Sequence, residues 1–155
     1  LRNKTMVIVT LSLDGIGDVH DYVRWPIKWK NYKQTVQSYK NLQKQYPLLK
    51  LNCWTTVSSL NVENLPNILD YAFEQGLDHD WAFLNRPDPL NVKYKNKFTT
   101  RAKQKLSKSS YPICRELSKK IAVAQDNNSL LELFIKRQDR LRKIYISDYL
   151  NLLPK

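Results

Sequence analysis

The feature that most constrains this chain is an apolar, β-branched run that turns abruptly into small and polar residues. The run Met6-Val-Ile-Val-Thr-Leu11 predicts a buried strand, and Ser12, Asp14, Gly15 and Gly17 follow it directly. α/β proteins present ligand sites in this way, because the strand fixes the position and the loop at its carboxyl end carries the polar groups. Two of the three glycines lie in this loop, where they permit a turn and a close approach of the backbone.

The rest of the chain alternates strand and helix patterns. Apolar residues recur every three or four positions over residues 28–46 and 65–75, which predicts amphipathic helices that end before Pro47 and Gly76. Strands are predicted over residues 5–11, 49–57 and 80–84, and further helices over 98–107, 112–124 and 129–142. Strands joined by crossover helices pair in parallel, with right-handed connections.

We therefore predict an α/β fold, with a partial (β/α) barrel-like parallel sheet of about three strands and crossover helices, followed by a helical C-terminal extension. Three strands are a narrow sheet for this much helix, so we expect them to be the last strands of a larger βα barrel or open sheet. We place the boundary after residue 92, with the partial barrel over 1–92 and a basic helical extension over 93–155.

Composition excludes several classes of protein. At 155 residues and 42% hydrophobic content the chain is long and apolar enough for a globular core. No apolar run approaches the roughly 20 residues that span a bilayer, and no secretory leader is visible, so we expect a cytoplasmic protein without a membrane partner. Cys53 and Cys114 lack the spacing of a metal or cluster motif, which predicts two free thiols and no metal site in this chain.

The net charge of +12 is spread unevenly. Residues 1–94 hold 11 Lys and Arg against 9 Asp and Glu, whereas residues 95–155 hold 15 against 5. Such a basic half suits nucleic acid, an acidic peptide or an anionic surface, but it is equally typical of a solvated face of helices. The chain has no RNA-binding signature and no phosphate-binding GxxxxGK[ST] loop.

Ser12 and Arg24 are the first candidate site residues, because a serine at a strand end and an arginine 12 residues later can converge on one carboxylate. The alternative is a local ion pair of Arg24 with Asp14 or Asp21. Thr55, near the end of the second strand, is a further candidate, and with Asn52 and Thr56 it could line a cavity opposite Cys53 or serve only the fold.

Asp14, Asp18, His20 and Asp21 together could suggest a divalent metal ion. An Asp-Gly pair beside a strand is, however, typical of a turn in which the aspartate caps its own backbone. His20 and His79 are the only histidines, and neither stands in a recognisable triad, so we predict structural roles for both.

Ser12-Leu-Asp-Gly15, His20-Asp21 and Arg24, in this order, resemble the central segment of radical S-adenosylmethionine enzymes. The resemblance is closest to the branch that carries a twitch or SPASM C-terminal region, and it covers residues 5–85. Further agreement comes from Asn52-Cys-Trp-Thr-Thr-Val57, Leu65-Pro66, Glu74-Gln-Gly76 and, more weakly, Asp139-Arg-Leu-Arg142 and the Tyr149–Pro154 tail.

The resemblance implies that Ser12 and Arg24 bind the amino-acid part of S-adenosylmethionine. It leads us to assign Asp14, Gly15 and Thr55 to the same site, and an adenine contact to residues 81–84, represented by Phe83. The family's defining CxxxCxxC, which ligates a [4Fe–4S] cluster, is absent from this chain. We therefore expect the cluster ligands to lie outside it, upstream of Leu1, and the chain to be the C-terminal half of such an enzyme or a degenerate relative.

The implied activity belongs to the whole enzyme, not to this chain alone. With the upstream cluster segment and a reductant, it would form a 5′-deoxyadenosyl radical that abstracts hydrogen from a substrate, a peptide or another anionic molecule. The alternative is a non-catalytic basic module that binds nucleic acid or an acidic partner.

Overall fold

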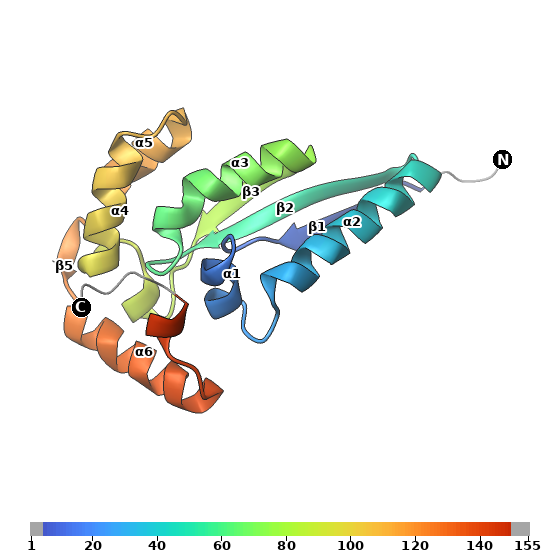
Figure 1. The fold of residues 1–155 in the computed structure, drawn as a ribbon. Coiled ribbons are helices and arrows are strands. Elements are labelled where there is room, and N and C mark those ends of the chain that lie inside the picture. The colour runs from blue at the N-terminus through green and yellow to red at the C-terminus, as the bar shows by residue number, and fades with distance from the viewer. Residues whose placement is uncertain (1–4, 150–155) are drawn as a thin grey trace.

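Strands and helices alternate along the chain in the computed structural model, which describes residues 5–149 (Figure 1). The strands are β1 (Val7–Ser12), β2 (Leu49–Val57), β3 (Asp78–Phe83), β4 (Tyr94–Lys95) and β5 (Ala124–Asp126). The helices are α1 (Asp18–Val23), α2 (Trp29–Gln45), α3 (Leu65–Gln75), α4 (Lys97–Ser107), α5 (Pro112–Lys120) and α6 (Asn128–Arg142). Short 3₁₀ turns cover Val62–Asn64, Asp88–Leu90 and Ile146–Asp148.

The first three strands form one parallel sheet, as predicted, and their order in it is β1-β2-β3. Leu11 pairs with Cys53, which in turn pairs with His79. Because α2 and α3 are the connections between these strands, the chain is a mixed α/β protein built on two crossover units. Helix α3 begins with Pro66 in its first turn and ends at Gly76 in the left-handed conformation, at φ 63°.

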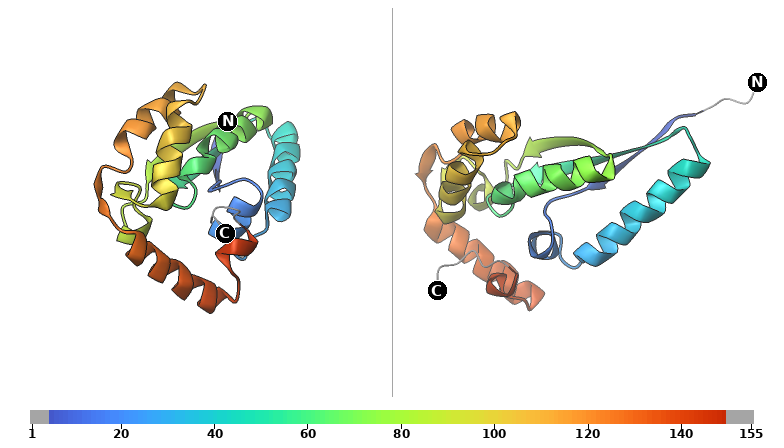
Figure 2. Two further views of the ribbon diagram at one scale, coloured as in Figure 1. Left: turned by 60° about the vertical axis from the view of Figure 1, so that its left-hand side comes forward. Right: turned by 45° about the horizontal axis from the view of Figure 1, so that its top comes forward.

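One face of this sheet carries the helices. Leu11, Leu13 and Cys53 pack in a single core with residues of both α2 and α3, and both helices run alongside the strands in Figure 2. The strand residues between them point to the opposite face, where Ile8 is 57% and Trp54 38% exposed. We call this second side the open face; within the described residues no helix covers it.

Helices α4, α5 and α6 gather at the carboxyl ends of the strands, away from the loop between α2 and β2 (Figure 1). Between them lies a second, two-stranded parallel sheet of β4 and β5, which sequence patterns did not predict. Strands of two and three residues are too short to show any alternation of apolar and polar residues. The six-residue helix α1 was missed for the same reason. Helix α5 ends at Lys120, so residues 121–124, which were predicted to belong to it, lie outside it.

One buried cluster contains residues from both sides of position 92. Val57 and Leu65, from the sheet segment, pack in one buried cluster with Val92, Ala102 and Leu117. The first helices of the extension are therefore continuous with the core of the three-stranded sheet. The tail Leu150–Pro154, part of the family resemblance, lies outside the described residues.

Gly15 is the glycine of the β1–α1 loop that the packing requires. A Cβ atom at this position would lie 2.8 Å from the backbone nitrogen of His20 and 2.8 Å from Cγ1 of Val19. Such distances demand a movement of α1, because the backbone nitrogen belongs to the helix itself. The sequence therefore uses glycine here so that α1 can fold back onto the end of β1.

We predict that Gly15→Ala destabilises the protein by about 1–3 kcal/mol, the range for overpacking a filled site. The measurement is the free energy of unfolding in urea. Gly76→Asn is the matched control, because nothing lies within 4 Å of a Cβ there and asparagine tolerates the left-handed conformation. Equal stability of Gly15→Ala and the wild type would show that α1 does not depend on this close approach.

Candidate functional site

The carboxylate of Asp14 joins the loop after β1 to the end of β2. Its Oδ1 atom accepts a hydrogen bond from the Thr56 backbone N–H at 2.7 Å, and its Oδ2 atom lies 3.2 Å from Nη1 of Arg24. Asp14 is buried, whereas 35% of the Arg24 side chain is exposed. The expectation that Asp14 caps its own backbone in a turn is therefore wrong, because its carboxylate binds the neighbouring strand and Arg24 instead.

Asn61 closes the same region from the other side. Its Nδ2 donates to the backbone oxygens of Asp14 at 3.0 Å and Thr56 at 2.9 Å, and its Oδ1 accepts from the Ser58 N–H at 2.7 Å. Neither Asn61 nor Asn64, which precede α3, caps a helix with its side chain. Instead, Asn64 Oδ1 accepts from the Ile16 N–H at 2.7 Å, which ties the β1–α1 loop to α3.

The ion pair offered as the alternative role of Arg24 is present, and its partner is Asp14. Asp21, the other partner considered, lies 3.4 Å from Nζ of Lys28 and accepts the Trp29 N–H. The pair with Asp14 engages one guanidinium nitrogen and holds Arg24 at the carboxyl ends of the strands. It does not use up the five N–H donors of an arginine.

Ser12 is the last residue of β1 and lies on the open face, half-buried, opposite Trp54 in the strand register. Its hydroxyl makes no hydrogen bond within the described residues. Thr56, two positions beyond Trp54, lies on the same face, and its hydroxyl also lacks a partner within residues 5–149. The open face therefore presents two free hydroxyl groups near its carboxyl edge.

Thr55 and Phe83 lie on the other face. Thr55 is fully buried on the same side as Cys53, which corrects the expected opposition of the two, and its hydroxyl donates to the Leu13 carbonyl at 2.6 Å. Phe83 packs edge-on against Trp81, 5.1 Å between ring centroids, beside the core that includes α4 and α5. Alternation along β2 and β3 thus separates these two predicted site residues from Ser12.

Thr55 also contacts a histidine. His79 Nε2 lies 2.8 Å from the Thr55 hydroxyl oxygen. Since the Thr55 proton goes to Leu13, His79 donates through Nε2, as both the neutral and the charged imidazole can. Burial lowers the pKa of His79 below its usual value, which favours that neutral form. This supports the predicted structural role of His79.

His20 is fully buried against aromatic rings. The Trp29 and Tyr32 centroids lie 5.4 and 4.9 Å from its own, and neither ring nitrogen has a hydrogen-bond partner within the described residues. Burial, helped by the positive charge of Arg24, lowers its pKa, and the carboxylates of Asp21 and Asp14 oppose this less strongly. His20 belongs to the packing beneath α1.

A cavity of about 200 Å³ lies between the ends of the strands, α1 and α6. Its polar lining comprises Asp14, Tyr22, Thr56, Ser58, Gln138 and Arg142. Its apolar lining comprises Val23, Leu60, Leu84, Leu90 and Phe134. We call it the α6 cavity. Sequence reasoning missed it, because α6 follows the strands by many residues and only folding brings it to their ends.

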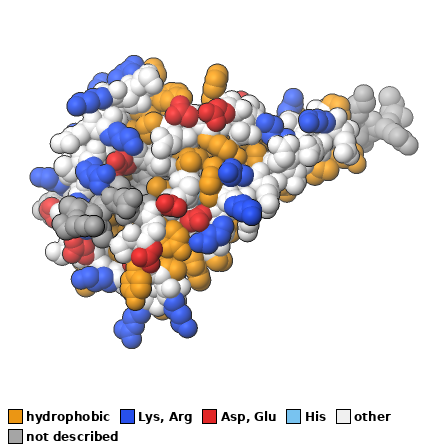
Figure 3. Space-filling model, in the orientation of Figure 1, with side chains coloured by type: hydrophobic (Ala, Val, Ile, Leu, Met, Phe, Trp, Pro, Cys, Tyr) orange, Lys and Arg blue, Asp and Glu red, His pale blue; other side chains and the backbone are white. Residues whose placement is uncertain are grey.

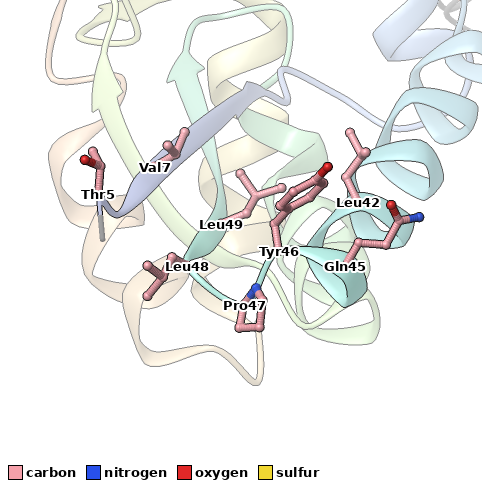
Figure 4. A pocket seen from close by; sticks show the side chains of 8 residues that line it. All are labelled: Thr5, Val7, Leu42, Gln45, Tyr46, Pro47, Leu48 and Leu49. Atoms are coloured by element: carbon pink, nitrogen blue, oxygen red, sulfur yellow. The ribbon is translucent and has the colours of Figure 1, made fainter. Parts of the chain in front are cut away.

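A second cavity, of about 400 Å³, lies at the opposite end of the sheet (Figure 4). Its lining comes from β1, the end of α2 and the following loop, and includes Val7, Leu42, Tyr46 and Leu48. These side chains are apolar or aromatic and surround the space without a charged group. Nothing in the structure shows what covers this surface, so we assign no ligand to this cavity.

Neither a metal site nor a membrane-spanning helix occurs within residues 5–149. No three His, Cys, Asp or Glu side chains come together there in a way that could hold a metal ion, and none of the described helices is both long and apolar enough to cross a bilayer. Cys53 and Cys114 are free thiols buried in two different cores. Burial raises the pKa of Cys53 to about 12.

Positive charge covers the helices of the C-terminal half. Lys and Arg side chains are spread over α4, α5 and α6 instead of forming one compact patch (Figure 3). Some have acidic partners, such as Lys97 at 3.4 Å from Glu132 and Lys119 at 2.7 Å from Glu116. The surface therefore suits a diffuse electrostatic attraction better than a single shaped anion site.

Comparisons with known proteins identify no relative. None of the protein-family models matches this chain, and neither a curated protein nor a solved structure is significantly similar to it. The function is therefore argued from the geometry of the site, together with the resemblance of the Ser12–Arg24 pattern.

We predict that Asn61→Ala destabilises the protein by about 2–4 kcal/mol, because it leaves three buried backbone groups without their partner. Urea unfolding followed by circular dichroism measures the change. Asn41→Ala is the matched control, since Asn41 is exposed on α2 and contacts only the Gln37 side chain. A loss below about 0.5 kcal/mol for Asn61→Ala would contradict its role in joining the two loops.

Stability should fall as the pH drops below about 6.5, the unperturbed value for histidine. Both histidines have pKa values lowered by burial, so the unfolded chain takes up protons more readily than the folded one. Urea titrations between pH 7.5 and 5.0 measure the slope. We expect His20→Leu to reduce the slope of unfolding free energy against pH, and the double variant His20→Leu/His79→Gln to reduce it further. An unchanged slope in the double variant would show that the two histidines do not cause the loss of stability.

Proposed function

We propose that this chain is the S-adenosylmethionine-binding, carboxyl-terminal part of a radical S-adenosylmethionine enzyme, with its three strands belonging to a partial (β/α) barrel. The observation that carries the proposal is the placement of Ser12 and Arg24 at one edge of the sheet. Both stand in the order of the family pattern. Ser12 ends β1, and Arg24, the residue after α1, is held near the same edge by its ion pair with Asp14. α/β proteins bind ligands at the carboxyl ends of parallel strands.

The chemistry of this edge fits the amino-acid part of the cofactor. A carboxylate needs donors, and Arg24 retains N–H groups beyond the one that contacts Asp14. The Ser12 hydroxyl supplies a further donor from the open face. Asp14 and Gly15 take part indirectly, since Asp14 orients Arg24 and Gly15 lets α1 approach the strand.

Two of the predicted contacts, Thr55 and Phe83, do not lie on the open face. The Thr55 hydroxyl donates to the Leu13 carbonyl on the helix-covered face, so in this proposal Thr55 supports the site without touching the cofactor. Phe83 supports β3 from the helix-covered face. Ala82, its exposed neighbour, is the residue of β3 that an adenine ring could approach.

The two cysteines of this chain do not fit as ligands of an iron–sulfur cluster. Cluster ligation needs several thiolates at one place, whereas Cys53 and Cys114 are buried in separate cores. Burial raises the pKa of both thiols, which disfavours the thiolate. Under the proposal a [4Fe–4S] cluster is held by an upstream segment that also covers the open face.

Bound beside a reduced cluster, S-adenosylmethionine would supply radical chemistry that abstracts a substrate hydrogen atom. This chain would contribute binding and orientation: Ser12 and Arg24 hold the cofactor's amino-acid part, and the strands fix their positions. An external reductant for the cluster and a substrate, a peptide or another anionic molecule, would be the partners.

The test is S-adenosylmethionine binding, measured by calorimetry in the natural full-length protein with its cluster assembled. We expect Arg24→Gln to weaken binding about tenfold or more, because a charge-assisted, bidentate contact is lost. Ser12→Ala should weaken it by a smaller factor. Arg86→Gln, in the exposed loop after β3, is the matched control and should bind normally.

Arg24→Lys guards this test against a folding defect, since it keeps the positive charge beside Asp14 while removing the planar fork. Weaker binding by Arg24→Lys, with an unchanged melting temperature, supports the proposal. Wild-type affinity in both Arg24 variants would overturn it.

One observation favours a second candidate, a non-catalytic basic module. Residues 95–155 carry a net charge of +10, and most of their Lys and Arg residues belong to α4, α5 and α6. Association with nucleic acid through such a surface would be mainly electrostatic, and its affinity would fall steeply with salt.

A salt titration separates this candidate from the first. Under it, binding of a single-stranded RNA or a DNA duplex should weaken by orders of magnitude between about 50 and 200 mM salt. A triple glutamine substitution of Lys103, Lys105 and Lys108 on and after α4 should weaken binding more than the same change at Lys30, Lys33 and Lys44 on α2. Absent or salt-independent binding would exclude the module.

A further inference from the structure

The α6 cavity contains a positive charge that the fold does not neutralise. Arg142, at the end of α6, lines it and donates through Nη1 to the Tyr22 backbone oxygen at 3.1 Å. Its guanidinium carbon lies 5.9 Å from the ring centroids of both Tyr22 and Trp25. No carboxylate among residues 5–149 lies within ion-pair distance of it. Arg142 thus keeps unused N–H donors toward the cavity.

Further contacts fix the end of α6, the helix that carries Arg142. The Tyr22 hydroxyl donates to Asp139 Oδ1 at 2.7 Å, and Asp139 Oδ2 accepts from the Ile146 N–H at 2.9 Å. Burial and the neighbouring carboxylate raise the pKa of Tyr22, so it remains a donor. These buried bonds fix the end of α6 against α1. The Arg142 guanidinium itself is held by the Tyr22 carbonyl and the Tyr22 and Trp25 rings, so it loses less conformational freedom when it binds a ligand.

The rest of the lining defines the ligand. The Thr56 hydroxyl and the Gln138 amide line the cavity without a hydrogen-bond partner in the described chain, and Leu60, Leu84 and Phe134 make its walls apolar. Asp14 is also present, but both its oxygens are engaged by Thr56 and Arg24. One free positive charge beside an aliphatic wall matches a singly charged ligand better than phosphate, whose second charge would face Asp14.

We propose that the α6 cavity binds a small aliphatic carboxylate, with Arg142 as the carboxylate anchor and Thr56 and Gln138 as additional hydrogen-bonding groups. The cavity is smaller than the sites of drug-sized ligands, so it holds a short acid or the acidic end of a larger molecule. If the proposed function holds, on which this step rests, the carboxylate belongs to the substrate, next to the cofactor edge at Ser12 and Arg24.

The test uses butyrate as the probe and the indole N–H of Trp25 as the reporter, followed by ¹H–¹⁵N NMR spectroscopy of the full chain. Trp25 contacts Arg142, whereas Trp29, Trp54 and Trp81 serve as internal references. Salt is held at about 150 mM to screen diffuse attraction to a basic protein. We expect saturable shifts of the Trp25 signal with a dissociation constant in the millimolar range. Trp25→Phe assigns the signal.

Butyramide and inorganic phosphate separate the ligand classes. Butyramide has the same shape without the charge, so we expect no saturation with it. Phosphate should bind more weakly than butyrate. Equal binding of butyramide would overturn the assignment of a carboxylate site, and tighter binding of phosphate would replace it by a phosphate site.

Variants test the anchor. Arg142→Gln should weaken butyrate binding about tenfold or more, and Arg140→Gln, two positions away and exposed on the same helix, is the matched control. If Arg142→Gln fails to fold, Thr56→Val and Arg142→Lys are tested in its place. Each should weaken butyrate binding severalfold while the ¹H–¹⁵N NMR spectrum remains native. Wild-type butyrate affinity in the folded Arg142 variants, or no Trp25 shift in the wild type, would overturn the proposal.

The outcome is independent of cofactor binding. Ser12→Ala should weaken S-adenosylmethionine binding and leave the butyrate titration unchanged, because Ser12 does not line the α6 cavity. A failed butyrate titration with intact cofactor binding therefore removes only the carboxylate site. The reverse result removes the cofactor proposal and leaves an acid-binding cavity.

Discussion

The interaction on which the rest of the site depends is the buried carboxylate of Asp14. It receives a backbone N–H from β2 and pairs with Arg24 after α1, so one side chain joins three segments. A buried carboxylate is stable only when its oxygens are satisfied, and here both are. Asn61 completes the junction by bonding the backbone on both sides. Without these bonds the loops after β1 and β2 would have no common position.

A second buried carboxylate also joins segments that are far apart in the sequence. Asp139 receives the Tyr22 hydroxyl and the Ile146 N–H, and so attaches α6 to α1. The consequence is a composite cavity, in which residues 14–60 supply one wall and residues 134–142 another. The two proposals use different parts of this region: Ser12 and Arg24 for a cofactor, and Arg142 for an acidic ligand.

The three-stranded sheet has an unequal pair of faces. Helices α2 and α3 bury one face in a shared core, whereas the other exposes Ile8 and Trp54 beside polar residues. A parallel sheet is ordinarily covered on both faces. The open face and the free hydroxyl of Ser12 support the view that another segment or a ligand completes this side. The basic helices α4 to α6 frame the carboxyl end and would attract an anion to it.

Several features were readable from the sequence by itself because they arise from local patterns. The strands β1, β2 and β3, the helices α2 and α3, and the glycine at the end of α3 follow from periodicity and from residues that stop a helix. The position of Ser12 at the end of β1 follows from the same patterns, whereas Arg24 is placed by its ion pair with Asp14. The order of these residues also carries the family resemblance, which depends on the sequence alone.

Only the tertiary structure decided which face each side chain takes and what it meets there. Thr55 and Thr56 are adjacent, yet Thr55 is buried against Leu13 whereas Thr56 lines the α6 cavity. Successive side chains of a strand point to opposite faces of the sheet, and only one of these faces packs against the core. The partners of Asp14, Asn61 and Asp139 lie far away in the sequence, so no local pattern predicts them. The free charge of Arg142 is likewise a tertiary property, since it depends on which carboxylates the fold has already engaged elsewhere.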